Sequence, residues 1–269
     1  IKPHEAVTSV DTASEALAVS IAEKACVDIA YMEQLTGKTS DELTTELQGV
    51  IFRVPGPVPE GEQPIYVTAD EYLSGNVRRK LRQAQRAAEQ DSAFTINVKA
   101  LTAAQPKDLD ASEIEVRLGA TWIDKTYIQQ FMYETFNTPL YLQNNYGIEV
   151  HYSPYTAEWQ ISGKTSVSGN DVAAYTTYGT SRANAYKILE DSLNLRDVRI
   201  YDTIEDADGK ERRVLNAKET TLAAQKQQAI RDAFKDWIWK DPERRQTLVR
   251  QYNEEMNSTR PREYDGSHI

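Results

Sequence analysis

Residues 68–91, TADEYLSGNVRRKLRQAQRAAEQD, are the stretch around which we expect the rest of the chain to be organised. Thr68, with Glu71 three residues later, has the form of a capping box, which predicts a helix start. In the longer helix that follows, four apolar residues share one stripe at 100° per residue, and four arginines crowd the opposite face. The apolar residues are Val77, Leu81, Ala84 and Ala88, and the arginines are Arg78, Arg79, Arg82 and Arg86. The arginine side is typical either of a solvated surface or of a contact with the phosphate backbone of DNA.

Composition limits what this helix can belong to. The chain has 269 residues, 40% of them hydrophobic and 27% charged, which is typical of a globular protein with a real core. Its net charge of −10 means that any DNA contact must use a local basic patch. The single cysteine, Cys26, excludes an internal disulfide and favours a reducing, cytoplasmic location. No apolar run reaches membrane-spanning length, so we expect no membrane partner.

Residues 1–67 predict a winged-helix-like region. Residues 11–54 have the pattern of three short helices and a strand, followed by a Pro- and Gly-rich loop and the strand at 65–68. The third helix, which would read DNA in such a fold, carries Asp41, Glu42 and Glu46. Because these carboxylates would repel phosphates, we interpret the region as a packing or partner module.

Residues 68–215 predict a mixed α+β region that contains the basic helix. Within it, residues 107–123 predict a turn, a short strand and a glycine exit. Residues 148–152 and 159–161 predict a pair of half-buried strands, and residues 161–170 a mobile loop. Asp208-Gly209 predicts a β-hairpin between residues 198–206 and 210–215.

Residues 216–269 predict two C-terminal helices, the second beginning at Asp241-Pro242, and an extended tail after Asn257. The expected fold class is therefore α+β, helix-rich, with small antiparallel sheets, a winged-helix-like N-terminal part and a helical C-terminal part.

Several stretches imitate catalytic motifs. Gly-Lys-Thr occurs at 37–39 and 163–165, but the glycine that a P-loop needs five positions earlier is Met32 in one case and Glu158 in the other. Asp110, Glu115 and Arg117 imitate a nuclease core only faintly, because arginine stands in place of the usual lysine. The three histidines, His4, His151 and His268, are far apart and do not predict a metal site. We therefore assign no catalytic residue, no metal and no cofactor to this chain.

Five runs of sequence together carry a family resemblance. They are YLSGNVRRKL (72–81), EVRLGATWI (115–123), YGTSRANAYKILEDSLN (178–194), LNAKETTLAAQKQ (215–227) and YNEEMNSTRPREYDGSHI (252–269). They resemble the central region of very large proteins of phages and conjugative elements that join an adenine-specific DNA methyltransferase to a Swi/Snf-like helicase, and the resemblance extends from about Asp28 to Ile269. Some members of that family act as antirestriction factors carried with phage DNA. The resemblance implies that this chain, which begins without a methionine, is a segment between a preceding methyltransferase, which uses S-adenosylmethionine, and a following helicase, which uses ATP with magnesium.

Three hypotheses follow for the segment itself. The first is a non-catalytic coupling module that contacts DNA and transmits between the methyltransferase and the helicase. Its candidate DNA-binding residues are Arg78, Arg79, Arg82, Arg86, Lys164, Lys210, Arg212 and Arg213. The second is a structural scaffold that docks only onto the flanking domains, with Trp237, Trp239 and Tyr252 either as docking anchors or as ordinary core residues. The third is an enzyme activity without a recognisable motif.

Overall fold

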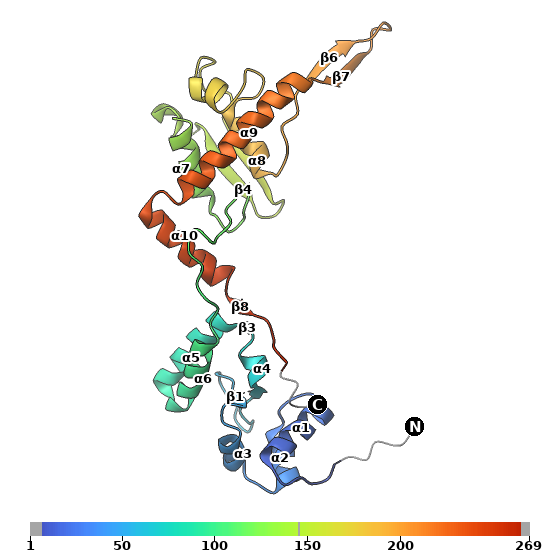
Figure 1. The fold of residues 1–269 in the computed structure, drawn as a ribbon, viewed down its shortest axis with the longest axis vertical. Helices are drawn as coiled ribbons and strands as arrows, with labels where there is room; N and C mark the ends of the chain where they lie inside the picture. The colour runs from blue at the N-terminus through green and yellow to red at the C-terminus, as the bar shows by residue number, and fades with distance from the viewer. Residues whose placement is uncertain (1–6, 145, 265–269) are drawn as a thin grey trace. The chain divides into compact units, whose positions relative to one another are not determined.

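The computed structural model describes residues 7–144 and 146–264, so His4 and His268 and the last five residues of the predicted tail lie outside the described residues. Contacts divide the chain into two compact units (Figure 1). Unit 1 is formed by the described residues of Ile1–Asp108 and Asn253–Ile269, and unit 2 by those of Leu109–Tyr252. These units cut across the regions 1–67, 68–215 and 216–269 expected from the sequence, because the C-terminal segment pairs with the N-terminal part of the chain.

The fold is α+β and helix-rich, as predicted. Each of the four sheets in the described part of the chain is a pair of antiparallel strands, β1–β2, β3–β8, β4–β5 and β6–β7. Within residues 7–144 and 146–264, no helix combines the length and the apolar character needed to cross a membrane.

The N-terminal part of unit 1 has the predicted winged-helix order of elements. They are α1 (Ala13–Lys24), α2 (Ile29–Thr36), α3 (Ser40–Glu46), β1 (Ile51–Arg53) and β2 (Tyr66–Thr68). The predicted capping box is present at the start of α3, where Thr39 accepts a hydrogen bond from the Glu42 amide and the Glu42 carboxylate accepts one from the Thr39 amide. Leu17, Met32 and Leu43 bring the three helices together in one buried cluster.

The second part of unit 1 holds the basic helix. Its elements are α4 (Ala69–Tyr72), β3 (Gly75–Asn76), α5 (Val77–Gln90), the 3₁₀ turn η1 (Ser92–Phe94), α6 (Thr95–Ala103) and β8 (Thr259–Arg260). Val77 and Ala84 of α5 are fully buried with Leu101 of α6, as the apolar stripe predicts. The predicted extended tail forms β8, which pairs with β3 through Gly75–Arg260 and Asn76–Thr259.

The capping box predicted at Thr68 and Glu71 is wrong. Thr68 is the N-cap residue of α4, but its side chain makes no capping hydrogen bond. The single turn of α4 is stabilised at its other end, where the Lys80 ammonium donates to the carbonyl oxygens of Glu71, Tyr72 and Ser74 at 2.8–3.1 Å. Burial lowers the pKa of Lys80, and these three carbonyls hold its ammonium in place.

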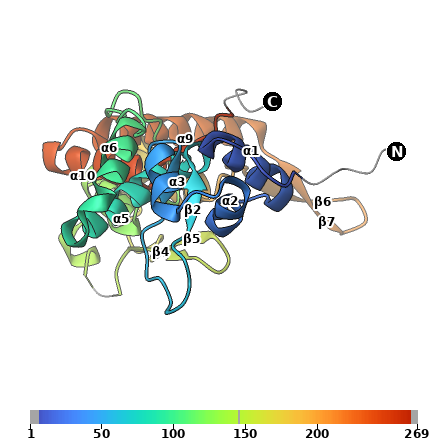
Figure 2. The same ribbon diagram turned by 90° about the horizontal axis from the view of Figure 1, so that it is seen from below.

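Unit 2 is built around the long helix α9. Its elements are α7 (Lys125–Thr135), the 3₁₀ turn η2 (Leu140–Leu142), β4 (Glu149–Ser153), β5 (Glu158–Ser162), the π-helical turn η3 (Ala173–Thr177), α8 (Ala185–Leu193), β6 (Tyr201–Glu205), β7 (Glu211–Leu215), α9 (Ala217–Ile238) and α10 (Pro242–Glu255), whose last residues belong to unit 1. Helix α9 packs against α7 and α8, and the β6–β7 hairpin extends from its N-terminal end in both views (Figures 1 and 2). Phe131 of α7 is fully buried, with its ring 5.1 Å from that of Phe234 and 5.6 Å from that of Trp237.

The short strand predicted within residues 107–123 is wrong. Val116 and Leu118 are buried in the core of unit 2, but no described segment pairs with this stretch, so it packs through its side chains alone. The chain leaves it at Gly119, whose φ is +90°, and a Cβ there would stand 2.5 Å from the carbonyl oxygen of Leu193. Only glycine fits that close approach.

Candidate functional site

The basic face of α5 is the first candidate. Asn76 caps the helix by accepting a hydrogen bond from the Arg79 amide at 3.0 Å. With Val77 buried, the helical period directs Arg79, Arg82 and Arg86 to solvent, and all three are exposed. Within the described residues, no hydrogen bond or ion pair holds their guanidinium groups. We call these three residues the arginine face.

Arg78 differs from the other three arginines of α5. Its Nε donates to the carbonyl oxygen of Asn257 at 2.9 Å, and its Nη2 donates to the Asp108 carboxylate at 2.6 Å and to the carbonyl oxygen of Pro106 at 3.4 Å. Only 15% of its side chain is exposed. Arg78 therefore joins α5 to the chain after α6 and to the C-terminal tail, and its charge is engaged within unit 1.

Lys164 is also engaged. Its ammonium lies 2.6 Å from the Glu190 carboxylate of α8 and donates to the carbonyl oxygen of Ile161 at 3.1 Å. Asn184 Nδ2 donates to the Lys164 carbonyl oxygen, and the nearby Val167 is buried in the core. These contacts hold this part of the predicted mobile loop against unit 2.

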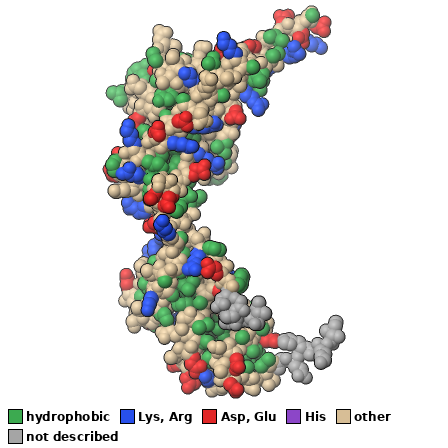
Figure 3. Space-filling model, viewed as in Figure 1, with side chains coloured by type: hydrophobic (Ala, Val, Ile, Leu, Met, Phe, Trp, Pro, Cys, Tyr) green, Lys and Arg blue, Asp and Glu red, His purple; other side chains and the backbone are tan. Residues whose placement is uncertain are grey.

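The β6–β7 hairpin carries the remaining sequence candidates. Pairing of Ile204 with Arg212 and of Thr203 with Arg213 places the two arginines on opposite faces of the hairpin. Arg212 Nε lies 3.7 Å from the Asp206 carboxylate, and the Arg213 guanidinium lies over the ring of Tyr201, 4.4 Å from its centroid. Lys210 is exposed. The hairpin carries both acidic and basic side chains (Figure 3), so it is not a uniformly basic surface.

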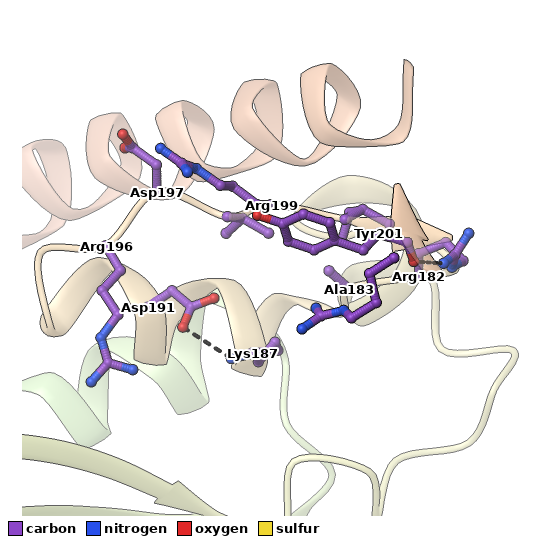
Figure 4. A pocket seen from close by; sticks show the side chains of 11 residues that line it. Arg182, Ala183, Lys187, Asp191, Arg196, Asp197, Arg199 and Tyr201 are labelled. Atoms are coloured by element: carbon purple, nitrogen blue, oxygen red, sulfur yellow. Dashed lines mark hydrogen bonds and ion pairs between the residues drawn. The ribbon is translucent and has the colours of Figure 1, made fainter. Parts of the chain in front are cut away.

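A pocket of about 420 Å³ in unit 2 is lined by five cationic side chains. Of these, the sequence analysis had identified only Arg213. We call this cavity the basic pocket. The side chains of its charged lining residues are drawn in Figure 4. They are Arg182, Lys187, Arg196, Arg199 and Arg213, with the two carboxylates Asp191 and Asp197. The cations come from the segment before α8, from α8, from the segment before β6 and from β7, and no single periodic pattern in the sequence links them.

The aromatic side chains considered as docking anchors belong to the core of unit 2 or pack against it. Trp237 is 9% exposed, and its Nε1 donates to the Glu134 carboxylate at 2.6 Å. The ring of Tyr252 packs edge-on against that of Trp122 at 5.2 Å, and Trp239 packs against the same core. They stabilise unit 2 and offer no exposed anchor.

The described residues contain no group of three or more His, Cys, Asp or Glu side chains that could hold a metal ion. His151, on β4, lies 3.8 Å from the Glu149 carboxylate at the surface. Neither residue lines the basic pocket.

Comparison with known families gives two matches. Residues 117–258, just over half of the chain, match the model described as "Domain of unknown function (DUF8437)". Residues 9–58 match the model described as "Probable helicase, winged helix domain", which agrees with the winged-helix order of α1 to β1. No curated protein and no solved structure matches the chain. The first match lies largely in unit 2 and the second in unit 1.

Proposed function

The chain belongs to the family of the domain of unknown function DUF8437, and on that premise, together with its helicase-type winged helix, we propose that it is a non-catalytic module that contacts DNA. In this proposal it acts in the cytoplasm and couples the methyltransferase and helicase domains of a large parent protein. The likeness to a winged helix of probable helicases supports the helicase side of the proposal. The methyltransferase side rests on the sequence resemblance alone.

The arginine face is the observation that carries the proposal. Arg79, Arg82 and Arg86 are exposed, lie on one side of a capped helix and have no partner among the described residues. A row of guanidinium groups on a rigid helix suits contact with successive phosphates of a DNA backbone, because arginine binds phosphate in a bidentate manner. Such contacts position DNA without reading its sequence.

Helix α3 is not assigned to DNA in this proposal. It carries Asp41, Glu42 and Glu46, and the Lys38 ammonium is paired with Glu46 at 2.7 Å. A DNA backbone would meet net negative charge there, so we assign the winged helix to contact with another protein domain.

A scaffold without DNA contact is the second candidate function. It is favoured by the ion pairs of Arg78 with Asp108 and of Lys164 with Glu190, which balance the charges of two of the eight candidate cations. Under this alternative the winged helix would dock onto a flanking domain and the arginine face would be solvated.

One pair of variants separates the two functions. Arg82→Gln removes a charge from the arginine face, and Lys99→Gln removes one exposed charge from α6 of the same unit. We expect Arg82→Gln to weaken binding of fluorescently labelled duplex DNA several-fold in anisotropy titrations at low salt and Lys99→Gln to leave it unchanged. Equal behaviour of the two variants, or no binding by the unaltered chain, would favour the scaffold.

A further inference from the structure

We propose that the basic pocket of unit 2 is a binding site for phosphate groups. The phosphate could be carried by a DNA strand or by a free nucleotide, and the first source rests on the proposed function. The site is distinct from the arginine face, because its lining residues all belong to unit 2 and those of the arginine face to unit 1.

The alternation of residues 198–201 builds one wall of the pocket. All four residues line the pocket: Val198 and Ile200, 4% and 8% exposed, also pack into the core, and Arg199 and Tyr201, which alternate with them, supply the polar groups of this wall. The segment is fixed because the Ile200 carbonyl oxygen accepts a hydrogen bond from the amide of Asn216, the N-cap of α9. Arg199 is thus held on an ordered backbone.

Two of the five cations are free of carboxylates in the described structure. Arg199 is exposed and has no hydrogen bond or ion pair with any described residue. Arg213 contacts the ring face of Tyr201, which orients its guanidinium and leaves its N–H groups free of a carboxylate partner within residues 7–144 and 146–264. These two arginines are the groups that we assign to direct phosphate contact.

The other cations of the pocket are already positioned by neighbours. Arg182 donates to the Asp202 carboxylate at 2.8 Å and to the carbonyl oxygen of Tyr201 at 2.9 Å, and the Lys187 ammonium lies 3.0 Å from Asp191 (Figure 4). Because Asp202 and Asp191 balance their charges, these two cations add little net positive potential, and their pairing fixes the side chains around the free arginines.

The two carboxylates that line the pocket would repel a bound anion only weakly, because each has a cationic partner. Asp191 is paired with Lys187, and Asp197 lies 3.8 Å from the guanidinium of Arg231 on α9. The positive charge of Arg199 and Arg213 therefore remains uncompensated at the pocket. A volume of about 420 Å³ is large enough for a nucleotide, and the open pocket can equally admit one phosphate of a longer strand.

The hairpin supplies a matched control for the test. Arg213 and Arg212 are neighbours on β7 but point to opposite faces, and only Arg213 lines the pocket. The double variant Arg199→Gln/Arg213→Gln is therefore compared with Arg212→Gln. All three substitutions are at exposed positions, where a change of side chain has little effect on folding.

The full chain is titrated with pyrophosphate and with ATP by calorimetry, and with labelled single-stranded oligothymidine by anisotropy. We expect Arg199→Gln/Arg213→Gln to weaken the binding of at least one of these ligands roughly tenfold, because each hydrogen bond removed is to a charged group, and Arg212→Gln to weaken neither pyrophosphate nor ATP. If the double variant weakens only DNA binding, the site holds a nucleic-acid strand. If it weakens only the binding of pyrophosphate and ATP, the site holds a free nucleotide. The proposal is overturned if no ligand binds or if the double variant binds each as tightly as the unaltered chain.

The variant Arg79→Gln/Arg82→Gln/Arg86→Gln distinguishes the proposed DNA contact of the arginine face from the proposed phosphate site of the basic pocket. It leaves the pocket intact, so we expect pyrophosphate binding to be unchanged. Failure of DNA binding throughout, with pyrophosphate binding that depends on Arg199 and Arg213, would remove the proposed DNA contact and leave the phosphate site standing.

Discussion

The arginine face of unit 1 and the basic pocket of unit 2 both gather positive charge, but the fold assembles them differently. The arginine face comes from one helix, and its three guanidinium groups have no partner among the described residues. The basic pocket collects five cations from four stretches of chain, and carboxylates hold three of them. A face on one helix depends only on local periodicity, whereas a pocket depends on the packing of the whole unit.

Because the basic pocket depends on packing, we expect it to respond more strongly than the arginine face to a substitution in the core. Phe131→Ala removes a fully buried ring that contacts Phe136, Phe234 and Trp237, so we expect unit 2 to lose about 3–5 kcal/mol of unfolding free energy. Phosphate binding by the basic pocket should fall with it. Urea unfolding measures the decrease, and Phe131→Leu is the milder control. A decrease below about 1 kcal/mol would contradict the tight packing of Phe131 in the core of unit 2.

Two adjacent arginines of α5 differ in their roles, because Arg78 makes internal hydrogen bonds and Arg79 is exposed. Arg78→Gln breaks the hydrogen bonds to Asp108 and Asn257, and we expect it to cost about 1–3 kcal/mol of the stability of unit 1. Arg79→Gln should change stability by no more than about 0.5 kcal/mol, because its side chain is exposed. Thermal unfolding of both variants tests the division. Equal destabilisation by the two substitutions would contradict the distinct structural role assigned to Arg78.

The smallest expected effect is at acid pH and concerns Asp202, the carboxylate paired with Arg182. Hydrogen bonds from Arg182 and from Asn216 lower the pKa of Asp202 below its ordinary value of 3.8. Because this pKa is depressed in the folded state, the ionised carboxylate stabilises the fold above the unfolded pKa, and this stabilisation disappears as the pH falls through the folded pKa. NMR titration should show the pKa of Asp202 rising towards 3.8 in Arg182→Gln. An unchanged pKa would mean that Arg182 does not hold this carboxylate.

Much of the fold could be predicted from local patterns. The three N-terminal helices, the apolar stripe of α5, the hairpin at Asp208-Gly209 and the start of α10 at Pro242 follow from capping, periodicity and turn chemistry. The short strand predicted within residues 107–123 was wrong because a strand needs a pairing partner as well as a suitable side-chain pattern, and none is found in the described structure.

The features that escaped prediction depend on residues far apart in the sequence. Strands β3 and β8 pair only two residues each, across most of the length of the chain. Arg78 and Lys164 looked available for DNA, but Asp108 and Glu190, which engage them, are brought close only by the fold. The basic pocket is missed for the same reason, since its cations share no helical or strand period.

The salt dependence of duplex DNA binding tests the central claim most directly. For the unaltered chain, the logarithm of the association constant should fall linearly with the logarithm of the salt concentration. In Arg79→Gln/Arg82→Gln/Arg86→Gln, the slope should decrease by about 0.9 for each phosphate that the variant no longer neutralises. An unchanged slope and affinity in this variant would contradict the assignment of the arginine face to DNA.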